Sequence, residues 1–470
     1  MTSRSGGLLE LVARGKKDVF FTSNPVVSFF HSVYMRSAAF SKEIYVTKPR
    51  NIPEWGHWVD FDIDHRGDLV RQFYLRIVLP TWLPTDVIKA NATGIVSDPS
   101  GVTFGYCNNI GFQMLDAIQV YQDQVLIHEV YGEYLDWRLR QSHGLATTLL
   151  VSAETGGREE TPLAIARSAT PGLLRVPIPI LGSQRIGDPG LPMVALRGQR
   201  YRIRIYLRNM EDVVVASDGR LRPSPWNMPL RIQATASGPI DSSQTTLART
   251  AMKHIDMSLE STQIYVPADV QVFLKAQTLR FPFQTIQFQE FTIEDNQLTA
   301  AAPPFSINFQ FPMKVDFIGS VDRLLLGCRS EASTLAGQRT QLRPAPGLST
   351  RFIQSIRLNI ANIDRIRLFD VSAFREVANY WKDCRMGLDL VDNTLPQEVY
   401  TISFGGFDSG EPVGTLNLTR AVLPTMYLTL APTAYDARNI SRKTSALLYA
   451  ESWNIFEIRG GKGKMLFDDS

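Results

Sequence analysis

The sequence predicts an all-β protein made of two similar halves, and three observations support this. Apolar and polar residues alternate with period two over many short segments, whereas helical periodicity is rare. The 27 prolines and 32 glycines interrupt these segments at short intervals, as in β-sandwiches and barrels. One order of elements also occurs twice. At 470 residues, the chain is long enough for two or three domains.

The clearest predicted strand is the segment YRIRIYLR at residues 201–208. Because side chains of a strand point alternately to its two faces, one face is apolar and the other carries three arginines. The apolar face consists of Tyr201, Ile203, Ile205 and Leu207. We therefore expect a half-buried strand here, and shorter strands over residues 400–404 and 416–419.

The repeated order is a strand, a turn, a second strand and a segment that carries two aromatic residues. It occurs first over residues 118–137, where the aromatic residues are Tyr134 and Trp137. It recurs about half a chain length later, where they are Tyr380 and Trp381. The two sequences are barely similar, so the repeat is one of pattern. Two unrelated hairpins remain the alternative.

Three polar stretches organise the rest of the chain. Residues 234–246 have low hydrophobicity and separate the halves, which predicts an interdomain linker. Residues 143–172 and 329–349 are too long for tight turns. Such long loops usually carry the contacts that differ between relatives.

The composition is that of an ordinary globular protein, with 44% hydrophobic residues, 20% charged residues and a net charge of +3. No run of five like charges occurs, so direct nucleic-acid binding is not expected. Cys107, Cys328 and Cys384 are odd in number and far apart, which favours small buried side chains over disulfides. The start of the chain does not have a signal-peptide pattern, and no apolar run is long enough to span a bilayer. We expect a cytosolic protein.

No motif for catalysis or for metal or cofactor binding emerges. The string that begins at His128 and Glu129 lacks the second histidine of a zinc motif. Residues 60–64 imitate the start of a calcium loop, but Gly at the sixth position and Glu at the twelfth are missing, which predicts a strand and a hairpin turn over residues 65–68. Residues 460–464 lack phosphate-loop spacing and predict a turn. We expect no enzyme activity, no cofactor and no metal.

Asparagine sequons occur at Asn91, Asn417 and Asn439. Asn91 is the most loop-like and is the candidate glycosylation site. Asn417 is expected to be buried within a structural motif.

The segment of residues 6–40 carries a family resemblance. An amphipathic start is followed by a Gly-Lys-Lys-Asp break, then by Asn24-Pro25, a Phe-Phe pair and the string VYMR. This order resembles the amino terminus of the major capsid proteins of large icosahedral nucleocytoplasmic double-stranded DNA viruses. Because an apolar face this short is not stable alone, we expect residues 6–17 to dock beneath the assembled shell unit.

Four more segments resemble the same family in order, so that the resemblance spans the chain. They are residues 118–142, 176–196, 397–420 and 449–467. The matching residues that we expect to hold structural corners are Asn24, Pro25, Pro189, Gly190, Pro412, Gly414, Asn417 and Arg420. Residues 313–318 and 385–392 depart from the family pattern. These departures leave open a specialised paralogue of the same shell.

The resemblance implies two tandem eight-stranded jelly rolls with short helices in the loops. The expected divisions are an arm at 1–19, jelly rolls at 20–237 and 251–460, a linker at 238–250 and a tail at 461–470. It also implies a homotrimer of pseudo-hexagonal shape that tiles an icosahedral capsid. The implied partners are other copies of the chain, minor capsid proteins, a penton protein and an inner viral membrane, in virions assembled in the host cytoplasm.

A double jelly-roll enzyme or carbohydrate-binding protein is the competing class. A bicupin would need clustered histidine and glutamate ligands, which the histidine spacing does not offer. A carbohydrate-binding protein is harder to exclude, because a sugar site needs only aromatic and amide groups. The solution mass distinguishes the two classes, since a stable trimer favours the capsid and a monomer the lectin.

Overall fold

The structure is a computed structural model that describes most of the chain after residue 38. The described residues are 39–80, 104–142, 145–159, 161–169, 171–184, 188–217, 253–294, 310–342, 353–368, 386–388, 396–405, 414–430 and 443–467. The chain divides into the units Met1–Phe40 and Ser41–Ser470, and all elements below lie in the second unit.

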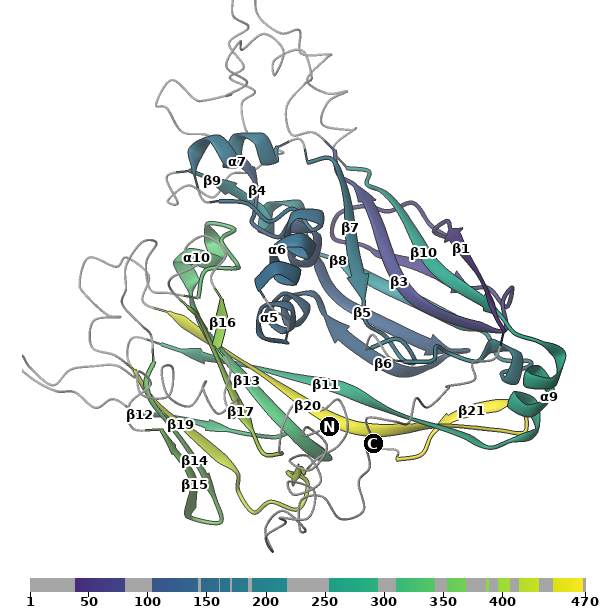
Figure 1. Cartoon of the computed structure of the whole chain (residues 1–470). Helices are drawn as coiled ribbons and strands as arrows, with labels where there is room; N and C mark the ends of the chain where they lie inside the picture. The colour runs from purple at the N-terminus through teal and green to yellow at the C-terminus, as the bar shows by residue number, and fades with distance from the viewer. Residues whose placement is uncertain are drawn as a thin grey trace, which may run out of the picture. The chain divides into compact units, whose positions relative to one another are not determined.

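The first half of this unit is an antiparallel sandwich of two four-stranded sheets (Figure 1). One sheet has the order β1 (Ser41–Thr47), β10 (Asp256–Tyr265), β3 (Leu69–Val78) and β7 (Leu173–Ile178). The other has the order β2 (Trp58–Ile63), β8 (Tyr201–Leu207), β5 (Leu115–Gln122) and β6 (Val125–Tyr131). A small additional sheet pairs β4 (Phe104–Tyr106) with β9 (Val214–Ala216). The eight main strands have the order of a jelly roll.

The second half repeats this strand order. Its first sheet has the order β11 (Leu279–Ile293), β20 (Thr444–Arg459), β13 (Ser320–Ser330), β17 (Pro396–Ser403) and β16 (Met386–Leu388). The short strands β18 (Leu416–Asn417) and β21 (Lys462–Met465) pair with β13 and β20. The other sheet has the order β12 (Gln310–Lys314), β19 (Thr425–Leu430), β14 (Ile353–Ile360) and β15 (Ile363–Leu368). The two predicted hairpins are therefore β5–β6 and β14–β15, in equivalent places.

Short helices lie in the connections, as predicted. They are α4 (Ile110–Gln113), α5 (Gly132–Ser142), α6 (Leu145–Glu154), α7 (Pro162–Ser168), α9 (Ala268–Ala276) and α10 (Glu331–Leu335), with 3-10 turns η1 (Met193–Ala195) and η2 (Met210–Asp212). Helices α6, α7 and α10 lie in the two long polar stretches. Helix α5 follows β6, the fifth strand of the first jelly roll. The fifth strand of the second roll is β15, and the predicted aromatic segment with Tyr380 and Trp381 that follows it lies outside the described residues.

The alternation in β8 has the predicted effect. Its apolar face is buried in the first sandwich, where Ile203 and Ile205 are fully inaccessible, and its other face is partly exposed. The facing strand β3 alternates in the same way, with Phe73, Leu75 and Ile77 inside. Burial of these side chains removes apolar surface from water, at about 25 cal/mol for each Å².

The position of β10 corrects the domain boundary predicted from the sequence. Residues 256–265 were assigned to the second jelly roll, but β10 pairs with both β1 and β3 of the first. A jelly roll closes when its last strand returns beside its first strand, and β10 is this last strand. The low-hydrophobicity stretch at residues 234–246 comes before β10 in the sequence, so it does not separate the two rolls. The first roll therefore ends with β10, and the second begins after the connection that contains α9.

One predicted turn has a different role, and another leads into a strand that was not predicted. The turn at residues 65–68 does not close a hairpin, because β2 pairs with β8 while β3 pairs with β10 and β7, so the turn carries the chain from one sheet to the other. The predicted turn at Gly460 and Gly461 is present, with φ of 61° and 85°, conformations that glycine adopts without strain. It leads into β21, so that much of the expected tail is a strand.

The segment at Gly190 closes the edge of the first sheet. Leu191 and Val70 exchange backbone hydrogen bonds of 2.8 and 3.0 Å. Gly190 has φ of 97°, and a Cβ atom there would lie 2.8 Å from the Val70 carbonyl oxygen. Both its conformation and the close approach of the chain therefore favour glycine.

We expect Gly190→Ala to lower the free energy of unfolding by about 1–3 kcal/mol, because it adds backbone strain and a contact with the Val70 carbonyl oxygen. The measurement is the urea midpoint. Gly172→Ala is the matched control, since a Cβ atom at Gly172 meets nothing within 4 Å. Equal midpoints for the two variants would contradict the role of Gly190.

Candidate functional site: the contact between the two jelly rolls

Helix α5 joins the two jelly rolls by packing its aromatic residues on a sheet of the second roll (Figure 1). Trp137 and Tyr134 are fully buried. The Trp137 ring stands edge-on against Tyr449 of β20, with centroids 5.1 Å apart, and Tyr449 stacks on Phe288 of β11 at 4.7 Å. A Cβ atom at Gly327 of β13 would lie 2.6 Å from Trp137 Cη2. Glycine is therefore needed at position 327 for the indole ring to fit.

The strands β13 and β20, at the centre of the sheet formed by β11, β20, β13 and β17, are buried on both faces. Leu324 and Leu326 point into the core of the second roll, whereas Leu325 and Tyr449 belong to the apolar cluster of the first roll. Leu325 is paired with Tyr449 across β13 and β20. Because successive side chains of a strand alternate between faces, a continuous apolar run in β13 supplies both contacts.

Buried hydrogen bonds and ion pairs accompany this apolar contact. The Tyr134 hydroxyl donates to Glu451 Oε1 at 2.7 Å, and Arg323 Nε lies 2.8 Å from Glu451 Oε2. Arg329 of β13 donates to Glu133 of α5, and both side chains are 4% exposed. Burial and the nearby Glu451 carboxylate raise the pKa of Tyr134, so its hydroxyl remains a donor. Each charged group is paired, as burial requires.

A second polar contact joins β6 to β11. His128 Nε2 lies 3.0 Å from the Gln284 carbonyl oxygen, which also accepts from Gln184 Nε2 at 2.7 Å. Gln284 N in turn donates to Gln184 Oε1 at 2.8 Å. His128 Nε2 also lies 3.1 Å from Gln184 Nε2, and whether it donates or accepts depends on the ring tautomer. The other ring atom, His128 Nδ1, is buried and has no hydrogen-bond partner among the described residues. Burial, assisted by the positive charge of Arg138, lowers the pKa of His128 to about 4.

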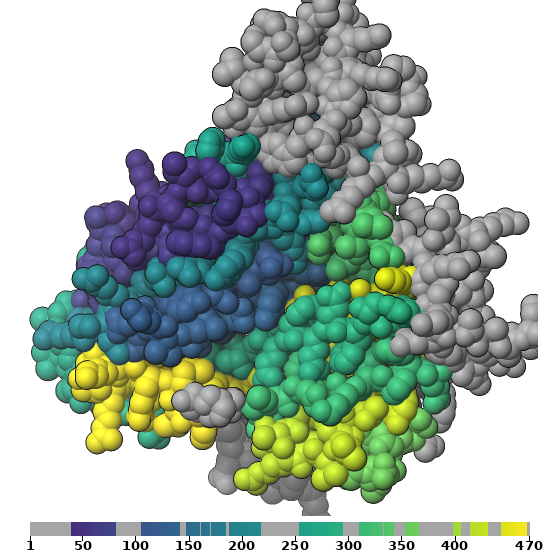
Figure 2. Space-filling view, turned by 180° about the vertical axis from the view of Figure 1, so that it is seen from behind, coloured from purple at the N-terminus to yellow at the C-terminus, as the bar shows by residue number. Residues whose placement is uncertain are grey.

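The C-terminal hairpin of the second roll also contacts the first roll. Gln122 Nε2 donates to the Gly463 carbonyl oxygen at 2.6 Å, and Gly463 N donates to Gln199 Oε1 at 2.8 Å. From behind, the yellow C-terminal strands lie directly along the blue β5–β6 region (Figure 2). We call the contacts of α5, β5 and β6 with β11, β13, β20 and β21 the inter-roll contact.

None of the motif residues predicted from the sequence is among the described residues that form the inter-roll contact named above. Asn417 is exposed, not buried as expected, and its Oδ1 accepts from the Arg420 backbone N–H at 3.1 Å. Arg420 is also exposed, and Gly414 has φ of 103°. Pro189 is exposed, and Gly190 closes the sheet edge described above. The predicted positions Asn24, Pro25, Asn91 and Pro412 lie outside the described residues. The corner roles of the motif residues stay predictions.

Other features of the described chain bear on function classes. Cys107 and Cys328 are buried. Within the described ranges, no group of three histidine, cysteine or acidic side chains is placed to hold a metal ion. No helix among those described has the length and apolar character needed to cross a membrane.

Gly327 and Trp137 provide a direct test of the inter-roll contact. We expect Gly327→Ala to lower the free energy of unfolding by about 1–3 kcal/mol, because the added methyl group overlaps the indole ring. Trp137→Phe removes the ring atoms that it would meet. The loss in the double variant should therefore be smaller than the sum of the two single losses. Additive losses in urea unfolding would show that the two residues are not in contact.

His128 provides a pH test. Because its folded pKa of about 4 lies below the ordinary value of 6.5, its contribution to stability is complete above pH 6.5 and falls as the pH drops from 6.5 towards 4. The loss is on the order of 3 kcal/mol. We expect His128→Gln to flatten this part of the stability profile, measured by urea unfolding at each pH. His57→Gln, at an exposed histidine, is the control, and an equal flattening in both variants would contradict the assignment.

Comparisons with known proteins agree with this architecture. A family model described as "Major capsid protein N-terminus" matches residues 28–256. The major capsid protein of Paramecium bursaria Chlorella virus 1 is 22% identical over 505 residues, covering 98% of this chain and 99% of that protein. Other matches are partial: the chain spans 36% of capsid protein 1 of Acanthamoeba polyphaga mimivirus at 28% identity, and 50% of the Pyramimonas orientalis virus major capsid protein at 27%.

Solved structures show the same fold. The crystal structure of PBCV-1 VP54 superposes with a TM-score of 0.67 at 16% identity, covering 94% of this chain and all of that one. The Faustovirus major capsid protein gives a TM-score of 0.61 at 13% identity, covering 95% and 94%. The sequence matches extend over both jelly rolls, whose strand orders are the same. The chain is therefore similar, in sequence and in fold, to the double jelly-roll major capsid proteins of large DNA viruses.

Proposed function

We propose that this chain is a structural capsid protein that forms homotrimers, and that these trimers tile the icosahedral shell of a large DNA virus. The observation that carries the proposal is the duplication of one jelly roll within the chain, held together by a buried inter-roll contact. Three chains of two similar lobes form a six-lobed block, and such a block can pack in a hexagonal lattice. Closed rings of this kind are a common solution in symmetric assemblies.

The proposed role is mechanical and not enzymatic. Several buried polar groups of the inter-roll contact, among them Glu133, Glu451 and the Gln284 carbonyl oxygen, are paired across the rolls and hold the two lobes in one arrangement. Such pairing suits a rigid building block, because each unpaired buried group would cost about 1–3 kcal/mol. We propose that residues 41–265 and 279–467 are the two lobes of this block.

The proposed partners follow from the similarity to these capsid proteins. Other copies of the chain form the capsomer and its lattice, minor capsid proteins join capsomers, and a penton protein fills the vertices. An inner viral membrane would lie beneath the shell, and the chain would not bind nucleic acid directly. We place the protein in the virion, after assembly in the cytoplasm of the host cell.

The solution mass tests this proposal. We expect a stable particle of three times the 52.7 kDa chain mass in light scattering at micromolar concentration, with more than roughly 2,000 Å² of surface buried between neighbouring subunits, as is usual in permanent assemblies. A folded monomer under these conditions would contradict the proposal and favour a double jelly-roll carbohydrate-binding protein.

A further inference from the structure

Helix α9, in the connection between the two jelly rolls, carries exposed apolar side chains. None of its nine residues is buried. Val272 is 65% exposed and Phe273 is 54% exposed, although both are large apolar side chains. The helix packs beside η1, and it is held by a polar contact in which Gln271 Nε2 donates to Asp68 Oδ2 at 3.2 Å. The chain therefore leaves two large apolar side chains of α9 uncovered, as at many interaction sites.

A second group of exposed apolar side chains lies at the turn between β5 and β6. Val125 is 66% exposed and Leu126 is 43% exposed. Beside this turn, Gln122 donates to the Gly463 carbonyl oxygen of β21, and Asp123 N donates to the Arg200 carbonyl oxygen at 2.7 Å. The turn therefore meets β21 and the connection before β8 at one end of the first roll. Helix α9 and the β20–β21 turn lie at this end too, at the lower right of Figure 1.

Exposed basic side chains accompany these apolar side chains. β11 begins shortly after α9 and pairs with β20, which turns back into β21. Phe456 and Ile458 on one face of these strands pack on the first roll, so the alternate residues lie on the opposite face. The connection before β8 is adjacent, because a Cβ atom at Gly461 would lie 3.9 Å from Arg197 Cβ. The exposed basic residues of these elements include Arg197, Arg200, Arg280, Arg459, Lys462 and Lys464.

The described acidic residues of these elements do not balance this positive charge. Glu457 is buried, with Arg280 Nε at 2.9 Å and Lys464 Nζ at 3.8 Å from its carboxylate. Asp123 and Asp269 are exposed. These three carboxylates are fewer than the basic side chains around them, so an excess of positive charge remains. We call α9, the β5–β6 turn, residues 197–200 and the β20–β21 hairpin with the start of β11 the basic end.

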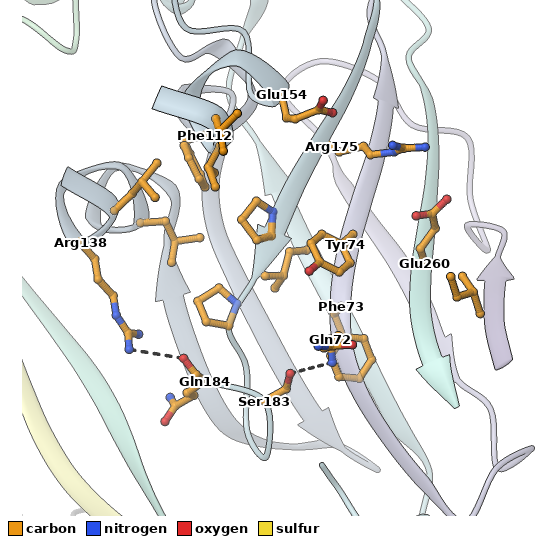
Figure 3. Close-up of a pocket in the computed structure, with 18 residues that line it drawn as sticks. Gln72, Phe73, Tyr74, Phe112, Arg138, Glu154, Arg175, Ser183, Gln184 and Glu260 are labelled. Carbon is orange, nitrogen blue, oxygen red and sulfur yellow. Dashed lines mark hydrogen bonds between the residues drawn. The ribbon is translucent and has the colours of Figure 1, made fainter. Parts of the chain in front are cut away.

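The groove over β7 on the same roll has a different charge pattern (Figure 3). It has a volume of about 770 Å³, and Arg138 and Arg175 lie in its lining together with Glu154 and Glu260. Because these charges have both signs, the groove does not favour an anionic surface as the basic end does.

We propose that the basic end binds the surface of a membrane that contains anionic lipids. Lysine and arginine side chains attract anionic headgroups, whereas exposed apolar side chains such as Phe273 enter the boundary between the headgroups and the acyl chains. The inference rests on the inner viral membrane of the proposed function, and it names the surface of the chain that meets this membrane.

A membrane suits the basic end better than a folded acidic protein does. The core of a protein–protein interface is usually one apolar centre within a polar rim. Here the exposed apolar side chains are divided between two elements, α9 and the β5–β6 turn, with basic residues on neighbouring elements. A lipid surface has no fixed shape and can accept separate apolar side chains while its headgroups contact the basic ones.

Vesicle flotation of the purified full-length chain tests this inference. We expect the chain to float with vesicles of phosphatidylcholine mixed with phosphatidylserine, and not with vesicles of phosphatidylcholine alone. Added salt should weaken the binding, because it screens charges at an exposed surface. Phe273→Ser should also weaken the binding, because it removes an apolar side chain that enters the bilayer boundary.

Charge reversal provides the matched comparison. We expect the double variant Lys462→Glu/Lys464→Glu to lower the partition into the mixed vesicles by about tenfold or more. The control is Lys253→Glu/Lys443→Glu, which changes the net charge equally. Its two exposed residues precede β10 and β20, at the ends of these strands that lie opposite the basic end. Melting temperatures measured on the same samples identify the variants that are folded.

Equal partition of the two folded double variants would overturn the inference, as would equal binding to both kinds of vesicle or no binding by the wild type. The solution mass of the same samples separates the inference from the proposed function. Wild-type trimers that do not bind the mixed vesicles would overturn the inference alone, whereas a wild-type chain that stays monomeric would overturn the proposed function.

Discussion

The burial of one sheet on both faces is the constraint on which the rest of the structure depends. The strands β13 and β20 carry long apolar runs, and only one face of each can be covered by the second jelly roll itself. Helix α5 covers the other face with Tyr134 and Trp137. The second roll would expose Leu325 and Tyr449 to water without the first, so the two rolls form one cooperative unit. The shared burial of these side chains joins the two lobes more firmly than a flexible linker could.

Polar groups fix the geometry of this apolar contact. Apolar surfaces can slide over each other with little loss, because the hydrophobic effect has no direction. The carboxylates of Glu133 and Glu451 and the carbonyl oxygen of Gln284 each require particular partners from the other roll. A shift between the rolls would leave these groups buried and unpaired, which costs about 1–3 kcal/mol for each group. The orientation of the lobes is therefore specified by hydrogen bonds and ion pairs.

Much of the fold could be predicted from the sequence, and much less of the inter-roll contact. The alternation at residues 201–208 and the repeated hairpins are local patterns, so they identify β8 and two equivalent strand pairs. The place of β10 depends on pairing with strands almost 200 residues earlier, and a polar stretch before it gave a misleading boundary. Position 327 is a second feature that local sequence patterns do not reveal. It requires glycine only because Trp137, far away in the sequence, packs against β13 in the folded chain.

The central claim is that the buried inter-roll contact joins the two jelly rolls into one cooperative unit. Urea unfolding of the whole chain, followed both by tryptophan fluorescence and by circular dichroism, tests it most directly. The account predicts a single transition with the same midpoint for both probes. Two separate transitions, one for each roll, would contradict the account.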